Sequence, residues 1–107
     1  MKSKATYNKK IDVNAFYSSG DSVNIRFLET FVWVAKLGSF RAAASQLHLT
    51  QAAISGRIAA LENDVGKKIF ERHGRQMRLN SAGKTLLHHA EHILRIEHDL
   101  RQELTGP

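Results

Sequence analysis

Cysteine is absent from the 107 residues of this chain, and proline occurs only once. The lack of cysteine excludes disulfide bonds and thiolate metal sites, and it fits a protein of the reducing cytosol. The scarcity of proline permits long uninterrupted helices. No apolar run approaches the length of a membrane span, and no hydrophobic stretch follows the N-terminal lysines as in a secretory signal. We therefore expect a cytoplasmic protein that is mainly helical.

Catalytic and metal-binding patterns are missing as well. There is no cysteine nucleophile, no glycine-rich phosphate loop and no convincing acid/base pair, so we expect neither an enzyme nor a bound cofactor. His88 and His92 have the i, i+4 spacing with which two histidines can share a metal ion, but no further ligand is clearly placed to complete a site. We interpret them as part of a solvated helix face and predict no metal.

The positive charge is concentrated in the middle of the chain, whose net charge is +6. Residues 1–22 carry four lysines and two aspartates (+2), and residues 23–80 carry nine basic and four acidic residues (+5). Residues 81–107 carry three basic and four acidic residues (−1). This distribution is typical of a protein in which one part attracts nucleic-acid phosphates and another part pairs with protein.

In the first half of the chain we expect an arm and two helices. Residues 1–22 show no periodicity, and we predict a flexible basic arm that either follows DNA phosphates or is a disordered leader. Apolar residues at helical spacing predict a first helix from about Asn24, which Gly38 ends. Ser39 is a suitable N-cap for a short second helix over residues 40–47.

A third helix and a hairpin follow a three-residue connection. Thr50 can cap a helix from Gln51 to about Asp64, whose buried face holds Ile54, Ile58 and Leu61. Residues 69–72 and 76–79 are two short strand-like runs around a glycine, which predicts a hairpin. Two helices joined by a short turn, with a hairpin after them, are the pattern of a winged helix-turn-helix that places its second helix in the DNA major groove.

The last helix is too long for so small a domain. Asn80 can cap a helix from Ser81 to about Leu104, which would be roughly 36 Å long. Because the domain cannot cover all of its apolar stripe, we expect a second copy of the helix to do so. We therefore predict a mainly α fold, with a winged helix-turn-helix of three helices and a two-stranded wing over residues 23–80 and a dimerisation helix over residues 81–107. The predicted dimer contacts are Leu86, Ala90, Ile93, Ile96, Leu100 and Leu104.

The same segments resemble the N-terminal domain of LysR-type transcriptional regulators. The resemblance covers residues 25 to about 95 without an internal gap. It is carried by residues 27–35, Gly38-Ser39-Phe40, Ala42-Ala43, Leu47, Thr50-Gln51, Ile54-Ser55, Leu61-Glu62, Gly66, Ile69-Phe70-Glu71-Arg72, Arg75, Leu79 and Ala82-Gly83. It implies a bacterial, nucleoid-associated protein that binds double-stranded promoter DNA as a homodimer. It also implies that an effector ligand would bind a larger C-terminal domain outside this chain.

Site residues follow from the resemblance position by position. Gln51 and Ser55 are expected at the major groove, and Thr50 is expected to contact a phosphate or to cap the helix. Arg72 and Arg75 are expected in the wing, near the DNA backbone or the minor groove. The chemistry of these side chains agrees with this placement. Gln can hydrogen-bond the edge of adenine, Ser can hydrogen-bond several bases, and Arg can bind phosphates and narrow minor grooves.

The third helix departs from the family pattern at two positions. Ala52 stands where the family usually has proline, and Gly56 stands where it usually has arginine. The helix face expected at the DNA therefore carries almost no side chain, and we hypothesise that the backbone approaches the bases closely there. Arg57, on the flank of this face, is expected to reach a phosphate. An alternative interpretation is a dimerisation or protein-interaction module without sequence-specific DNA binding, which the bare face favours and the wing arginines disfavour.

Overall fold

The computed structural model describes residues 22–74 and 76–106, and these form four helices and one hairpin. The helices are α3 (Ile25–Leu37), α4 (Phe40–Leu47), α5 (Gln51–Val65) and α6 (Ser81–Thr105). The strands β1 (Phe70–His73) and β2 (Gln76–Leu79) pair antiparallel, with Phe70 opposite Leu79 and His73 opposite Gln76. The predicted winged helix-turn-helix with a long final helix is confirmed. Of the predicted arm, only Ser22 lies within the described residues.

Side-chain caps begin the helices where the sequence predicts them. Ser39 Oγ accepts a hydrogen bond from the Ala42 N–H at 3.0 Å, and Asn80 Oδ1 accepts one from the Gly83 N–H at 2.8 Å. Each bond satisfies a backbone donor that has no partner inside its helix. In the α4–α5 turn, His48 adopts the left-handed backbone conformation, with φ 57°. The chain can thus reverse within three residues before α5 begins.

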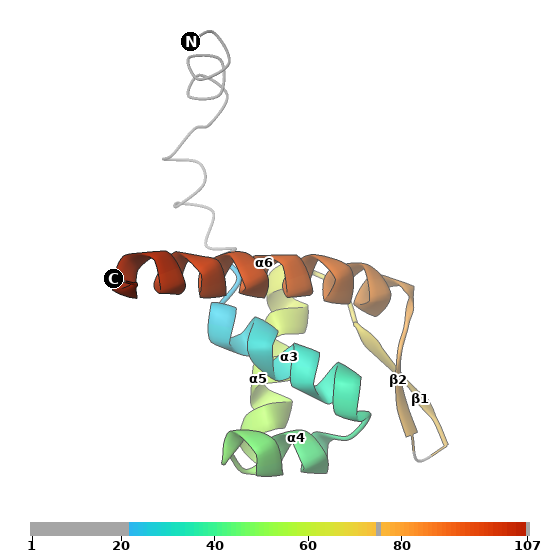
Figure 1. Cartoon of the computed structure of the whole chain (residues 1–107). Helices are drawn as coiled ribbons and strands as arrows, with labels where there is room; N and C mark the ends of the chain where they lie inside the picture. Colours follow the sequence, from blue (N-terminus) through green and yellow to red (C-terminus); the bar gives the residue numbers. More distant parts are fainter. Residues whose placement is uncertain (1–21, 75, 107) are drawn as a thin grey trace, which may run out of the picture.

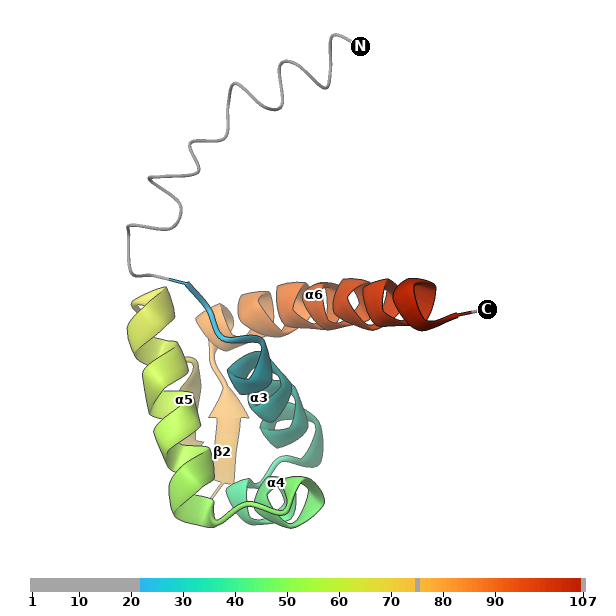
Figure 2. The same ribbon diagram turned by 90° about the vertical axis from the view of Figure 1, so that its left-hand side faces the viewer.

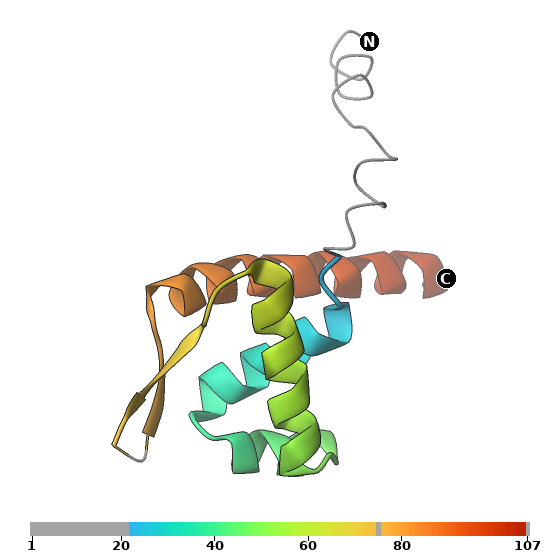
Figure 3. The same cartoon turned by 180° about the vertical axis from the view of Figure 1, so that it is seen from behind.

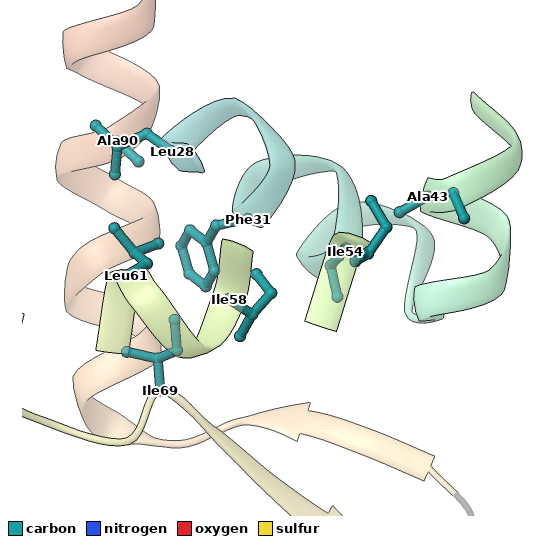
Figure 4. Packing of buried hydrophobic residues seen from close by; sticks show 10 residues of the cluster. Leu28, Phe31, Ala43, Ile54, Ile58, Leu61, Ile69 and Ala90 are labelled. Atoms are coloured by element: carbon teal, nitrogen blue, oxygen red, sulfur yellow. The ribbon is translucent and has the colours of Figure 1, made fainter. Parts of the chain in front are cut away.

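The core lies where α3, α5 and α6 meet. Figure 4 shows Phe31 of α3 packed among Ile58 and Leu61 of α5, with Ile69 below and Ala90 of α6 beside Leu28. All of these side chains are buried. At about 25 cal/mol per Å² of apolar surface removed from water, such burial is the main stabilising contribution to a domain of this size.

The hairpin is fixed to the rest of the domain at its base. Glu62 Oε2 accepts a hydrogen bond from the Ile69 N–H at 2.9 Å, and Asn80 Nδ2 donates one to the Lys68 carbonyl at 2.9 Å. The ring of Phe70 meets those of Phe31 and Phe40 edge to face, with centroids 5.6 and 6.0 Å apart. These contacts hold the first strand against α3 and α4 and set the direction in which the wing projects.

The helices and the hairpin are distributed between two opposite ends of the molecule. Figures 1 and 3 show α6 along one edge of the domain, while α4, the N-terminus of α5 and the tip of the hairpin all lie at the opposite end. In Figure 2 the C-terminal half of α6 extends beyond α3. The molecule therefore has one end formed by α4, α5 and the wing, and another formed by a projecting helix.

Candidate nucleic-acid interface

One face of α5 is exposed and nearly bare. Ile54, Ile58 and Leu61 are buried, as predicted, so the opposite side of the helix is turned to solvent. That side carries the exposed residues Gln51, Ala52, Ser55, Gly56 and Ala59. No internal contact fills the space at Gly56, where an added Cβ would meet no heavy atom within 4 Å. The surface of a binding partner can therefore approach the α5 backbone closely at Gly56 without displacing a side chain.

Thr50 takes the capping role that was one of its two predicted roles. Its Oγ1 accepts a hydrogen bond from the Ala53 N–H at 3.0 Å, which fixes the start of α5. Gln51 is the first residue of the helix and is exposed. Its side chain thus stands at the N-terminal end of α5, the end from which helix-turn-helix proteins contact base edges.

Arg57 is bound to the neighbouring helix α3. Its Nη1 donates a hydrogen bond to Thr30 Oγ1 at 3.1 Å, and its guanidinium carbon lies 5.5 Å from the centroid of the Phe27 ring. The Thr30 hydroxyl is fully buried and also donates to the Arg26 carbonyl at 3.0 Å. Because a guanidinium has five N–H donors, this contact leaves others for a phosphate. The sequence pattern did not indicate the Arg57–Thr30 bond.

The wing presents arginines on both of its faces. Arg72 on β1 lies opposite Met77, and Arg78 on β2 lies opposite Glu71; both arginines are exposed. Alternation along the strands places Arg72 and Arg78 on opposite faces of the hairpin. Sequence reasoning passed over Arg78, although the period of two would have marked it. Arg75 lies outside the described residues.

Helix α6 buries only part of its apolar stripe within the domain, which corrects the prediction for Ala90. Ala90 is completely buried inside the domain and therefore cannot face a second copy, whereas Leu86 is only partly buried, so its predicted dimer contact stays a prediction. The contact between Ala90 and Leu28 is visible in Figure 4. The other four stripe residues are exposed, by 39% at Ile93, 67% at Ile96, 54% at Leu100 and 76% at Leu104.

A charge pair ties α6 to α3 on the solvent side. Lys36 Nζ lies 2.6 Å from Glu91 Oε2, and this hydrogen bond lowers the pKa of the Glu91 carboxyl below its usual value. Further along α6, the hydrogen bond to Glu97 raises the pKa of the Arg101 guanidinium. The Lys36–Glu91 pair thus links the last turn of α3 to the middle of α6.

The histidines of α6 lie close together without a third ligand. The rings of His88 and His92 are 5.0 Å apart, yet the part of the chain that the structure describes contains no cluster of three His, Cys, Asp or Glu able to hold a metal ion. Across the same residues, no helix has both the length and the apolarity to cross a membrane.

Comparison with known proteins places this arrangement in a family. The profile described as "Bacterial regulatory helix-turn-helix protein, lysR family" matches residues 25–84. A curated relative from Azotobacter vinelandii, "Uncharacterized HTH-type transcriptional regulator in ibpB-leuC intergenic region", is 45% identical over 84 residues, covering 78% of this chain and 58% of the relative. The HTH-type transcriptional regulator CfxR of Cupriavidus necator is 47% identical over 73 residues, covering 68% of this chain and 23% of CfxR.

Solved structures agree with these relatives. The CbnR DNA-binding domain in complex with DNA superposes with a TM-score of 0.71 at 35% identity, covering 75% of this chain and 92% of that domain. The oxidized form of Corynebacterium glutamicum OxyR gives a TM-score of 0.77 at 28% identity, covering 82% of this chain and 27% of OxyR. This chain spans between 23% and 58% of the length of the first curated relatives that it matches.

Proposed function

Because the chain belongs to the lysR family of bacterial regulatory helix-turn-helix proteins, we propose that it binds promoter DNA sequence-specifically, as a homodimer. The observation that carries this proposal is the exposed, nearly bare face of α5 at the same end of the molecule as the wing (Figure 3). A helix with that free surface fits the major groove, which is wide enough to admit one α-helix. The DNA complex of the similar CbnR domain supports the same assignment.

Base contacts are proposed for the start of α5. Gln51 reads an adenine edge and Ser55 contacts an adjacent base, while Ala52 and Gly56 let the helix backbone come close to the base pairs. With so few side chains on this face, a large share of the affinity comes from phosphates and DNA shape rather than from base edges. Thr50 holds the helix end in position beside a phosphate.

Phosphate contacts are proposed for the arginines around α5. Arg72 and Arg75 of the wing lie at the backbone or the minor groove, and Arg57 reaches a phosphate from the flank of α5 with the donors that Thr30 leaves free. These positive groups belong to the segment that carries a net charge of +5, nine basic against four acidic residues. They provide the salt-dependent part of binding.

The second copy is proposed to pair through α6. Ile93, Ile96, Leu100 and Leu104 form a continuous exposed apolar surface, which monomeric proteins rarely present. Two recognition helices related by a two-fold axis would then enter successive major grooves of an inverted-repeat site. A regulator of this kind acts in the cytoplasm on the nucleoid, and we propose no catalytic activity for it.

Binding to selected and scrambled DNA at increasing salt tests the proposal. Sites are first selected from random DNA, and affinity is then measured by fluorescence anisotropy from about 50 to 200 mM salt. We expect a steep salt dependence and a clear preference for the selected sequence. Gln51→Ala should reduce that preference by about 5- to 150-fold, the worth of one base contact at ~1–3 kcal/mol. Gln102→Ala, an exposed glutamine near the far end of α6, is the matched control and should change nothing.

Equal binding to both sequences would contradict sequence-specific recognition. Absence of binding even at low salt would favour a dimerisation or protein-interaction module instead.

A further inference from the structure

A groove lies where α3, the hairpin and the start of α6 meet (Figure 1), on a surface that has no part in the proposed DNA contacts or in pairing. Its volume is about 320 Å³. Phe70, Met77 and Leu79 are partly buried and form its apolar base, and the exposed cations Arg78 and Lys84 stand at its edge. We call this surface the α3–β2 groove, and it combines apolar side chains with two positive groups.

Within the described part of the chain, both cations are available to an external anion. Arg78 Nη2 donates a long hydrogen bond of 3.5 Å to Gln76 Oε1. Glu71 lies opposite Arg78 in the hairpin, but its Oε2 is 2.8 Å from His73 Nε2 and is engaged there. Among residues 22–74 and 76–106, Lys84 forms no ion pair. An anion that reaches the groove can therefore bind either cation without displacing an internal carboxylate.

The positive surface continues from Lys84 along α6. Lys84, His88, Glu91 and Arg95 recur every three or four residues, so they share one side of the helix. Glu91 is the acidic member of this series, and Lys36 of α3 neutralises it at 2.6 Å. His88, Glu91 and Arg95 also line a smaller groove of about 150 Å³. A partner with several carboxylates along its length therefore meets positive charge beyond the α3–β2 groove.

This side of α6 stays open in the proposed dimer. Lys84 and Ile93 are nine residues apart, about two and a half turns, so they lie on opposite sides of the helix. Arg95 is likewise about 200° around the helix from Ile93. The described residues that line the α3–β2 groove come from α3, the hairpin and α6, so contact between α5 and DNA does not cover it. A dimer on DNA would thus still present two such surfaces.

We propose that the α3–β2 groove binds an acidic, amphipathic segment of another protein. A bulky apolar side chain of this segment packs against Phe70, Met77 and Leu79, and neighbouring carboxylates pair with Arg78 and Lys84. The apolar base favours a peptide over a nucleic acid, because a phosphate backbone offers little apolar surface to bury. An arginine also binds a carboxylate well, through two parallel N–H bonds. This inference goes beyond the proposed binding of promoter DNA and does not depend on it.

Met77 provides a reporter inside the groove, since the sequence has only two methionines. The full chain is isotopically labelled at the methionine methyl groups for NMR, and Met77→Leu identifies the Met77 signal by its loss. The probe is a synthetic peptide in which Asp and Glu alternate with Leu and Phe. We expect it to shift the Met77 signal to saturation, with a dissociation constant of about 100 μM or tighter. Arg78→Glu and Lys84→Glu should each weaken binding by about tenfold or more, the usual worth of a charge-assisted hydrogen bond.

Lys67→Glu is the matched control, because Lys67 is an exposed lysine that lines a different groove at the end of α5. It makes the same change in net charge, and it should leave the affinity for the peptide within about twofold. A polyglutamate peptide of the same length should bind at least about tenfold more weakly, because it has no apolar side chain for the base of the groove.

Two results would reduce the proposal to general charge attraction and so overturn it: equal weakening by all three charge reversals, or equal binding of polyglutamate. An unmoved Met77 signal at about 1 mM peptide would overturn it as well. The titration contains no DNA. A chain without sequence-specific DNA binding can therefore still bind the peptide, and the two proposals fail separately.

Discussion

Gly56 and Gly83 both lie inside helices, yet their surroundings are opposite. An added Cβ at Gly56 would meet open space, whereas one at Gly83 would overlap the Ile69 carbonyl oxygen and lie 2.8 Å from Leu79 Cδ2. The Gly83 position lets α6 begin directly against the base of the hairpin. Gly56 of α5 is thus accessible to an external partner, whereas Gly83 of α6 allows close packing inside the domain.

This contrast predicts opposite effects of the same substitution. Gly83→Ala should lower the free energy of unfolding by about 1–3 kcal/mol, the usual cost of overpacking a filled site. Gly56→Ala should raise it by about 0.5–1 kcal/mol, because alanine is the better helix former at an unhindered position. Urea denaturation of both variants at one protein concentration measures the two changes. Equal destabilisation by both would contradict the close approach at Gly83.

Arg57 combines a contact inside the domain with the proposed phosphate contact. Arg57→Met keeps the apolar stem but removes the bond to Thr30 and the cation over Phe27. We expect a loss of about 1 kcal/mol of stability, since Arg57 is only partly buried. The slope of log affinity against log salt should also fall by about one. Chemical denaturation and a salt titration report the two roles separately, and an unchanged slope would exclude the phosphate contact.

At the scale of elements, the helix boundaries were predictable because local chemistry sets them. Asn80 and Ser39 cap helices through their own side chains, and Gly38 and Gly66 adopt positive φ at helix ends, so a short stretch of sequence contains the whole signal. Contacts between distant residues leave no such signal. Arg57 and Thr30 are 27 positions apart, and nothing in either segment indicates their bond.

The apolar stripe of α6 likewise shows that contacts with distant residues cannot be predicted from local sequence. The sequence pattern groups Ala90 and Ile96 in one stripe, because both belong to a series of apolar residues spaced three or four positions apart. Only the packing against Leu28 reveals that Ala90 belongs to the domain core, so its burial depends on an element far away in the sequence. The exposed face at Gly56 was predictable, since it follows directly from the positions of Ile54 and Ile58 on the same helix.

The two faces of α6 are expected to respond differently to substitution. Ala90→Leu should destabilise each protomer by about 1–3 kcal/mol, because the site beside Leu28 is full. Ile96→Ala should leave the protomer intact but raise the dimer dissociation constant by about tenfold or more, since it removes apolar surface twice in each dimer. Analytical ultracentrifugation and circular dichroism distinguish association from folding. Unaltered dimerisation in Ile96→Ala would place the interface elsewhere.

At the scale of the whole molecule, the proposed pairing through α6 would connect two weak DNA contacts into one strong one. A single bare recognition helix and one wing offer few base contacts, so one protomer on one half-site should bind weakly. The proposed pairing through α6 would make the second contact intramolecular and raise the overall affinity by about 10²–10⁴ without any new contact to DNA. Affinity for an inverted repeat therefore depends on residues that lie far from the DNA.

Ile96→Asp should separate these two contributions. A carboxylate at the centre of the apolar stripe, present in both copies, should prevent pairing, because burying an unpaired charge is costly. Affinity for a two-half-site operator should then fall by about 10²–10⁴ to the level of a single half-site, while affinity for an isolated half-site stays unchanged. Ile93 is only 39% exposed, whereas Ile96 is 67% exposed, so a substitution at Ile96 disturbs the protomer fold less than one at Ile93. Anisotropy titrations with both DNA lengths measure the ratio, and an equal loss on both would mean that α6 acts on the fold rather than on pairing.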